Sequence, residues 1–433
     1  MATAICACRC SRHTDPRLTP GPLPMTFDDS TPLRRLPNFV SFWLARLLTT
    51  SAFQVLSVAI GWQVYSLTHN VFDLGLVGLI QFLPRIALVL VIGHVADRYD
   101  RRRVVGIAQL LQALSALSLA HGVFSGGLTR EWVFLAAFIM GAARAFEQPT
   151  SQALLPMLLP TAVLPRAIAA NASANELATI VAPALGGFLY AIGPGEVYLL
   201  GGCCYLLACV LNQLLRPRPA TAAPAQAASL DTFLAGIRFI RSRPDILGAI
   251  SLDMFAVLLG GATALLPVFA RDILHAGPMG LGLLRSAPGI GALLMSLWLA
   301  RHPPRHRVGR VMFIAVAVFG LSTIVFGLSS SFPLSLAALV VLGASDMISV
   351  VIRSAFIQLE TPDEMRGRVS AVNMLFIGAS NQLGEFESGA TAALVGTVPS
   401  VVIGGAGTLL VVVLWMRLFP SLAQREQLVT QAH

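Results

Sequence analysis

The chain has 433 residues, of which 55% are hydrophobic and only 12% are charged. Because soluble globular proteins carry about 25% charged residues, this composition excludes an ordinary soluble protein and indicates a polytopic membrane protein. The formal net charge is +9 and all 30 basic residues are arginine, but these arginines lie between apolar runs and not on a separate domain, so a nucleic-acid partner is not expected.

The chain begins with a polar segment, residues 1–39, which we expect to be a cytoplasmic tail. Residues 1–24 are rich in Pro, Arg and Thr and lack the apolar centre of a signal peptide. Our hypothesis is that residues 1–24 are a mis-started leader and that Met25 is the true start. The cysteines in CACRC (6–10) could bind a soft metal, but we favour the unstructured leader and expect no metal site.

Twelve apolar runs are each long enough, at about 20 residues, to cross a bilayer as a helix. They are 40–67, 73–96, 104–124, 131–155, 167–192, 196–215, 246–270, 278–300, 309–329, 333–358, 369–394 and 398–419. The connection 216–245 is the long one, Pro/Ala-rich and then amphipathic, which is typical of a linker along the membrane surface. The sequence thus predicts an all-α membrane protein with a six-helix bundle (40–215), a cytoplasmic linker (216–245), a second six-helix bundle (246–419) and a cytoplasmic tail (420–433).

Arginine is distributed very unevenly between the two sets of connections. With twelve spans, both termini and alternate connections share one side of the membrane, and that side holds 23 of the 30 arginines. The opposite connections hold two, Arg130 and Arg271. Because arginine in short loops stays on the cytoplasmic side, the sequence predicts that both termini are cytoplasmic.

The two halves carry a weak internal repeat at an offset of about 202 residues. The stretch GAAR (141–144) aligns with GASD (343–346), and further on Pro160, Arg166, Ala169 and Asn171 align with Pro362, Arg368, Ala371 and Asn373. Two related six-helix halves are a recurrent plan of secondary transporters, in which the substrate site lies near the bilayer midplane between the halves.

The loop after the second span, GHVADRYDRRRV (93–104), carries six charges between two apolar runs. Its Gly93, Asp97, Arg98, Arg101 and Arg102 resemble the signature loop of the major facilitator superfamily. The following aspartate of the loop, at 100, and the stretches FWLARLL (42–48), GWQVYSLT (61–68), LGLVGLIQFLP (74–84), LLRSAPGIGALL (283–294) and TPDEMRGRVSAV (361–372) are similar to its efflux branch, which includes the enterobactin exporter. The resemblance extends over the chain from about residue 32.

This resemblance implies that the loop is a cytoplasmic latch between the halves. In the family, the aspartate matching Asp97 faces the N-terminal end of span 11, where a carboxylate is stabilised by the helix dipole. Gly93, Arg98, Arg101 and Arg102 complete the latch. The corresponding loop after span 8, RHPPRHRVGR (301–310), lacks the matching glycine and aspartate, so we expect one latch and not two.

Span 5 contains the stretch APALGG (182–187), which resembles the antiporter motif GPxxGG of the superfamily, with alanine in place of its first glycine. The matching residues are Pro183, Gly186 and Gly187. In the family this motif accompanies export coupled to proton entry. The alternative is that proline and glycine here only permit a bend and close helix packing.

Several ionisable residues lie at membrane depth, where their cost usually means that they face an interior cavity. The candidate substrate and proton residues are Arg144, Glu147, Glu176, Asp253, Asp346, Arg353 and Glu385. Of their carboxylates, Asp253, Glu176, Glu385 and Asp346 are the candidate proton carriers, in no fixed order. Glu385 and Glu387 point to different faces of their helix, so at most one should face the cavity. Arg46 is expected to snorkel to the inner interface, and Arg85 to pair with a neighbouring carboxylate or carbonyl group.

The repeat puts Arg144 and Asp346 at equivalent positions with opposite charge. Our hypothesis is that they approach each other across the central cavity or flank one wet site. The alternative is a structural buried ion pair.

These features predict a secondary active transporter of the bacterial inner membrane. We expect it to export a small molecule, a siderophore-like metabolite or a drug, by alternating access, with the proton gradient as energy source, no cofactor and a monomeric chain. An importer working by symport is the alternative. The histidines form no cluster with catalytic spacing and there is no GxxxxGK[ST] motif, so we expect neither an enzyme nor an ATPase.

Overall fold

The computed structural model describes residues 32–88, 91–92, 95, 98–216, 230–304 and 306–427. Every regular element within these ranges is a helix. The predicted leader at 1–24 and residues 217–229 of the predicted linker therefore lie outside the described residues, as do Gly93 and Asp97 of the predicted latch.

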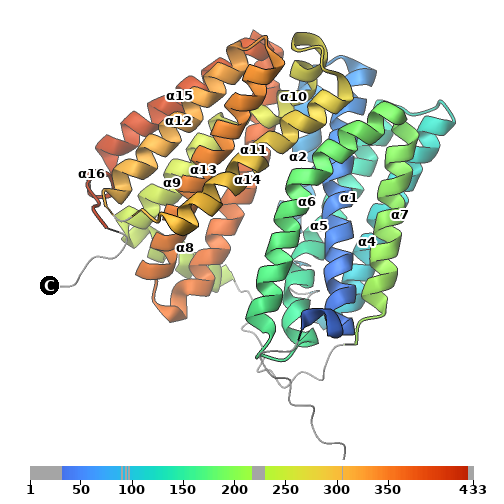
Figure 1. Cartoon of the computed structure of the whole chain (residues 1–433), viewed down its shortest axis with the longest axis horizontal. Coiled ribbons are helices and arrows are strands. Elements are labelled where there is room, and N and C mark those ends of the chain that lie inside the picture. The colour runs from blue at the N-terminus through green and yellow to red at the C-terminus, as the bar shows by residue number, and fades with distance from the viewer. Residues whose placement is uncertain are drawn as a thin grey trace, which may run out of the picture.

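The first half of the chain forms one bundle (Figure 1). A short 3-10 turn, η1 (Leu33–Arg35), precedes it. Its helices are α1 (Pro37–Thr68), α2 (Val71–Ala87), α4 (Arg101–Phe124), α5 (Arg130–Leu158), α6 (Leu164–Ile192) and α7 (Pro194–Gln213). Side-chain caps start several of them: Asn70 accepts from the Phe72 amide at 3.0 Å, and Thr129 accepts from the Trp132 amide at 3.3 Å. Sharp starts of this kind allow the short connections between neighbouring helices.

The second half forms a second bundle, joined to the first through the linker helix α8 (Leu230–Ser242). Its helices are α9 (Pro244–Leu259), α10 (Leu266–Val268), α11 (Gly277–Arg301), α12 (Val308–Leu328), α13 (Phe332–Glu360), α14 (Asp363–Val395), α15 (Thr397–Leu418) and α16 (Pro420–Ala423). Pro is at the first turn of α7, α9, α11 and α13, where its missing N–H costs nothing.

The seventh predicted span is not one continuous α-helix. After α9 ends at Leu259, the chain passes through Gly260 and Gly261 into a 3-10 turn, η2 (Ala262–Leu265), then α10, and then a π-helical turn, η3 (Phe269–Ile273). A Cβ at Gly261 would lie 2.7 Å from the carbonyl carbon of Gly384 on α14. The break therefore lets the backbone pass directly against α14, which a larger residue would prevent.

Nine helical stretches within the described residues are long and apolar enough to cross a membrane. Three predicted spans do not meet this criterion, namely α2, α5 and α14. The described α2 has only 17 residues. The helices α5 and α14 are long enough, but each carries several ionisable side chains. The all-α membrane architecture is confirmed, and the number of twelve spans stays a prediction for these three helices.

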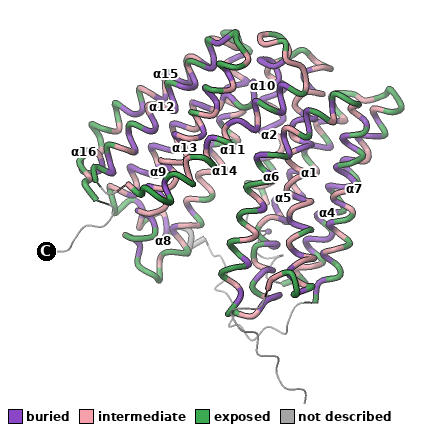
Figure 2. Tube along the Cα trace, in the orientation of Figure 1, coloured by how far each residue is buried: buried purple, intermediate pink, exposed green. Residues whose placement is uncertain are grey.

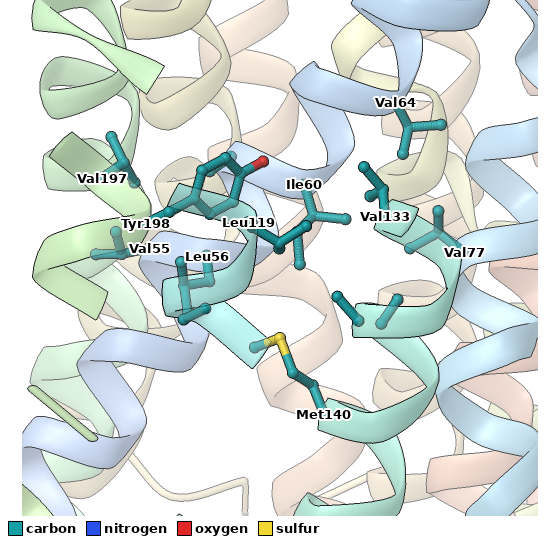
Figure 3. Packing of buried hydrophobic residues seen from close by; sticks show 14 of the residues in the cluster. Val55, Leu56, Ile60, Val64, Val77, Leu119, Val133, Met140, Val197 and Tyr198 are labelled. Carbon is teal, nitrogen blue, oxygen red and sulfur yellow. The ribbon is translucent and has the colours of Figure 1, made fainter. Parts of the chain in front are cut away.

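The apolar side chains divide between a buried core and the outer surface. In the first bundle, Leu56, Ile60, Leu119 and Tyr198 are almost fully buried where α1, α4 and α7 meet, and Met140 of α5 packs beside them (Figure 3). Large exposed aliphatic residues such as Ile314 of α12, which is 62% exposed, and Leu410 of α15, which is 59% exposed, are found along the outer helices (Figure 2). So much exposed apolar surface is suited to contact with lipid.

The two bundles approach each other at the end opposite the linker and diverge toward the linker end (Figure 1). At the closed end, Tyr65 of α1 donates a hydrogen bond to Asp272 of η3. Arg271 donates to the Ser66 hydroxyl at 3.1 Å. Glycines bring the helices together: a Cβ at Gly75 of α2 would lie 3.0 Å from the Gly389 Cα of α14. The halves are thus sealed against each other at this end.

Candidate functional site

A cavity of about 510 Å³ lies between the two bundles. Its walls come from α1, α2 and α6 of the first bundle and from η2, α11 and α14 of the second, with Pro267 of α10 beside them. The volume is in the range of small-molecule binding sites. The lining residues are Phe53, Gln54, Ser57, Ile60, Gly61, Leu74, Val77, Gly78, Gln81, Thr179, Pro183, Thr263, Ala264, Pro267, Arg285, Pro288, Gly289, Asn381, Gln382 and Glu385.

Two charged side chains line this cavity, Arg285 of α11 and Glu385 of α14, and they are close enough to interact electrostatically. Glu385 reaches across to the first bundle, because a Cβ at Gly78 of α2 would lie 2.7 Å from its Oε2 atom. Glu387 does not line the cavity, and its Oε1 atom instead accepts a hydrogen bond from Thr391 at 2.8 Å. One of the two neighbouring glutamates therefore faces the cavity.

A smaller pocket of about 60 Å³ adjoins the cavity and shares Phe53, Gln81 and Gln382 with it. Arg85 and Arg144 line this pocket. The Arg144 guanidinium lies 3.4 Å from the centre of the Phe53 ring, an attractive cation–π contact. No hydrogen bond or ion pair to Arg85 is found among the described residues, so the expectation that Arg85 pairs with a carboxylate or carbonyl group is wrong for this part of the chain.

In the first bundle, Arg46 of α1 donates to Glu147 of α5 at 2.9 Å, and both residues are buried. The expectation that Arg46 snorkels to the interface is therefore wrong. Position along the helix gave the depth of Arg46 but not the face that it occupies, and this face turns toward α5. Arg144 is close enough to Glu147 to interact electrostatically.

In the second bundle, Arg353 of α13 forms an ion pair with Asp253 of α9, and both residues are buried. Asp346 of α13 lies close enough to both to interact electrostatically. Asp253 and Asp346 line a void of about 10 Å³ together with Ser345 and Ser349, which is about the space of one water molecule. Three of the predicted site residues thus form one cluster inside the second bundle.

The two buried ion pairs join equivalent helices of the two halves, although they do not occupy equivalent positions of the repeat. Each joins the first span of a half to the fourth, over separations of 101 and 100 residues. The charges are exchanged: the first bundle has arginine on α1 and glutamate on α5, whereas the second has aspartate on α9 and arginine on α13. The pairs hold equivalent helices together with opposite polarity.

The structure does not bring Arg144 and Asp346 together. Arg144 lines the pocket between the bundles, whereas Asp346 lines the void within the second bundle, and the two sets of lining residues do not overlap. Glu176 is exposed on α6 and lines none of these cavities. The predicted set therefore divides into Glu385 at the main cavity, Arg144 and Glu147 beside it, the cluster around Arg353, and an isolated Glu176.

Sequence reasoning did not identify Phe53, Gln81 and Gln382, which line the cavity. Arg285 of the cavity and Arg85 of the adjoining pocket were recognisable as ionisable residues at membrane depth but were not included in the predicted site. One signal was present: Arg85 and Arg285 are separated by 200 residues, close to the repeat offset, on the second span of each half. The amide and aromatic side chains gave no comparable signal, because their orientation depends on the helix face.

The described part of the signature loop lies against its own bundle. Arg101 donates to the Ala153 carbonyl of α5 at 3.1 Å, and Arg102 donates to the Leu215 carbonyl after α7 at 2.7 Å. Arg98 is exposed. Asp100 accepts from the Arg102 amide at 2.9 Å and caps α4. These contacts fix the start of α4 against α5 and α7.

We expect Asp100→Ala to destabilise the protein by about 1 kcal/mol at neutral pH through loss of this cap. The hydrogen bond from the Arg102 side chain lowers the pKa of Asp100 below its usual 3.8. Because the folded-state pKa is lowered, the charge-dependent part of this stabilisation is complete above pH 3.8 and is lost as the pH falls through the lowered pKa. The difference in thermal midpoint between the two proteins should therefore narrow in acid. Asp100→Asn, which keeps the cap acceptor without the charge, should lie between wild type and Asp100→Ala at neutral pH.

The antiporter-like motif on α6 lies at the contact between the bundles. A Cβ at Gly187 would lie 3.0 Å from the Gly282 Cα of α11, and one at Gly282 would lie 2.6 Å from the Pro183 carbonyl oxygen. Gly186 faces the other way, and its Cβ would lie 3.0 Å from the Val55 Cα of α1. The motif therefore lets α6 pack closely both within its bundle and across to the other bundle.

Residues 29–433 match the model of a protein family described as transmembrane secretion effectors. The chain belongs to this family. The chain is therefore a membrane transporter of the major facilitator superfamily and not an enzyme, and the resemblance to that superfamily is confirmed. The Enterobactin exporter EntS of Citrobacter koseri is 26% identical to this chain over 401 residues, covering 91% of this chain and 95% of the exporter.

Solved structures of other transporters share the fold of this chain. A bacterial homolog of the human lysosomal transporter Spinster, in an inward-facing and unoccupied conformation, matches with a TM-score of 0.72 at 14% identity, covering 91% of this chain and 99% of that chain. A D-xylose-proton symporter matches with a TM-score of 0.68 at 15% identity, covering 89% and 99%. At these identities the likeness concerns the fold alone.

Proposed function

We propose that this chain exports a small molecule across the bacterial inner membrane by alternating access, in exchange for protons. The observation that supports this most directly is the polar cavity formed jointly by α1, α2, α6, α11 and α14, at the boundary of the two bundles. A site shared by two bodies can be exposed to either side when the bodies rock about it. The name of the exporters to which the chain is similar supports export.

The arginine distribution supports an orientation with the linker end in the cytoplasm. In that orientation the conformation described above is sealed on the outside by Tyr65, Asp272 and Arg271 and diverges toward the cytoplasm. The site would then take up its substrate from inside the cell. Closure of the linker end around the substrate and opening of the outer seal would complete the export stroke.

For the proton we propose the cluster of Asp253, Asp346 and Arg353. Two carboxylates beside one guanidinium leave one negative charge in excess, which a proton can neutralise. No hydrogen bond to Asp346 is found among the described residues, so Asp346 has room to change its protonation state. Glu385, which faces the substrate cavity, is the second candidate.

The proposal is tested by converting each carboxylate to its amide and measuring substrate-dependent proton movement in everted membrane vesicles. We expect Asp346→Asn to reduce proton-coupled transport at least about 10-fold, whereas facilitated exchange of substrate across the membrane should persist. Glu387→Gln is the matched control, because Glu387 bonds within its own helix to Thr391, and it should transport normally. Full proton coupling in Asp346→Asn, Asp253→Asn and Glu385→Gln alike would refute this assignment.

Import by symport is the alternative function, since the fold is shared with a D-xylose-proton symporter. The two directions differ in where the substrate accumulates. A proton-driven exporter fills everted vesicles with substrate and lowers the substrate content of intact cells, whereas a symporter fills cells or right-side-out vesicles. Measuring accumulation in both vesicle orientations, with and without an uncoupler, distinguishes the two.

A further inference from the structure

The ionisable groups around the substrate cavity are mostly cationic. Among the described residues that line the cavity and its adjoining pocket, three are arginines, Arg85, Arg144 and Arg285, and one is a carboxylate, Glu385. The cavity therefore has an excess of positive charge even when Glu385 is ionised.

The carboxylates near these arginines do not neutralise them. Arg144 rests on the Phe53 ring, and its nearby carboxylate, Glu147, is already bonded to Arg46 at 2.9 Å. Arg285 interacts with Glu385 only through space, with no hydrogen bond described between them.

A glycine of α14, Gly378, lies next to the Arg85 guanidinium. A Cβ at Gly378 would lie 3.6 Å from the Arg85 Nη1 atom, so backbone and not a carboxylate faces this guanidinium. Among the described residues, the donors of all three arginines thus remain available.

Guanidinium groups taken out of water without a partner are costly, and more so at membrane depth. An anion entering the cavity would supply that partner, because guanidinium and carboxylate or phosphate groups form paired, charge-assisted hydrogen bonds. Neutral donors are at hand as well, because the side-chain amides of Gln81 and Gln382 line both the cavity and the pocket.

We propose that the transported substrate is an organic anion that is attracted by Arg285 in the cavity and Arg144 in the adjoining pocket, with an apolar or aromatic body against Phe53, Ile60 and Val77. This inference rests on the proposed transport function and names the substrate class of the same cavity. Arg85 contributes to the positive potential at the rim of the site. Glu385 limits that potential and, by its repulsion of the anion, favours release.

Negative charge on the substrate also supports outward transport. The cell interior is electrically negative, so an anion leaving it moves down the potential. At 100 mV, the potential alone sustains a ratio of outside to inside anion concentration of about 50-fold per elementary charge. Proton entry and anion exit carry charge in the same direction, and the exchange is therefore electrogenic.

The test is binding of matched probes to the full chain reconstituted in phosphatidylcholine nanodiscs. The probes share one ring system: 2-naphthoate and 2-naphthyl phosphate are anionic, 2-naphthylmethanol is neutral and 2-naphthylmethylamine is cationic. We expect at least one anionic probe to bind more tightly than the neutral and cationic probes. Arg285→Gln and Arg144→Gln should each weaken its binding about 10-fold or more, whereas Glu385→Gln should strengthen it several-fold.

Arg310→Gln is the matched control, because Arg310 is exposed at the start of α12 and lines no part of the cavity. Its affinity should equal that of the wild type. Thermal midpoints of all variants separate loss of binding from loss of folding, and the gain expected of Glu385→Gln cannot result from unfolding. Binding of no anionic probe, tighter binding of the amine, or anion binding unchanged in both arginine variants would overturn the inference.

Proton-driven uptake of the same probes into everted vesicles distinguishes this inference from the proposed function. Uptake of the anion that falls when valinomycin and potassium collapse the potential supports both. Coupled uptake of the amine alone would leave the transport function standing and refute the anionic substrate. Anion binding without any proton-driven uptake would leave the anion site standing and refute proton-coupled transport.

Discussion

Replacing Arg353 with methionine is expected to destabilise the protein by about 3 kcal/mol and to abolish transport. Methionine retains much of the side-chain volume but leaves the buried Asp253 carboxylate without the guanidinium that bonds it. Asp346 lies beside the same arginine, so two carboxylates lose their shared cation at once. The thermal midpoint of the purified full chain and proton-driven transport in vesicles measure the two effects.

The double variant Asp253→Asn with Arg353→Met separates charge from packing. It should recover part of the lost stability, because Asp253 no longer carries an unpaired charge and only Asp346 remains without its cation, but it should not recover proton coupling. The equivalent substitution in the first bundle, Arg46→Met, should destabilise by a similar amount through Glu147. A double variant as unstable as Arg353→Met alone would mean that packing, and not the ion pair, holds α9 to α13.

Substituting leucine for Gly187 is expected to reduce transport to background while the protein remains folded. A Cβ at this position would lie 3.0 Å from the Gly282 Cα on the other bundle, so a leucine side chain fits only if α6 and α11 separate. Closure at the end opposite the linker then becomes unfavourable. The chain should remain open at that end and fail to alternate.

The measurement is the reactivity of a cysteine introduced at Ser57, which lines the cavity, in a background without the native cysteines. In intact cells, a membrane-impermeant thiol reagent should label Ser57→Cys faster when Gly187→Leu is also present. Gly367→Leu is the matched control, because a Cβ at Gly367 meets no atom within 4 Å. Normal transport by Gly187→Leu, or unchanged labelling, would contradict the closed contact described here.

The sequence alone was sufficient to predict the helical membrane architecture and the family. Long apolar runs determine helices because backbone groups in lipid must bond within the segment, and the signature loop carried the family resemblance. The structure diverges from expectation where sequence gives a residue's depth but not its direction. Arg46 lies near a helix end, yet it faces α5 and bonds Glu147.

The repeat was informative about equivalence and misleading about proximity. It relates Arg144 to Asp346 on the fourth span of each half, but Arg144 faces the pocket between the bundles, whereas Asp346 faces the interior of the second bundle. The cavity itself depends on α2 and α14 packing through Gly75 and Gly389. Such a pairing between halves leaves no periodic signal in either helix.

The break after α9 has a consequence for the order of events. Up to Leu259 the span packs in the second bundle against α13, α14 and α15. Beyond Gly261 its turns pack against α11 and α14 of the same bundle and also contact α1 and α2 of the first bundle. One span of the second bundle thus contacts both bundles, with a diglycine joint between its two parts. Bending at that joint allows the cytoplasmic side of the cavity to close around the substrate before the outer seal opens. The cycle can therefore pass through an occluded form in which the cavity is closed on both sides.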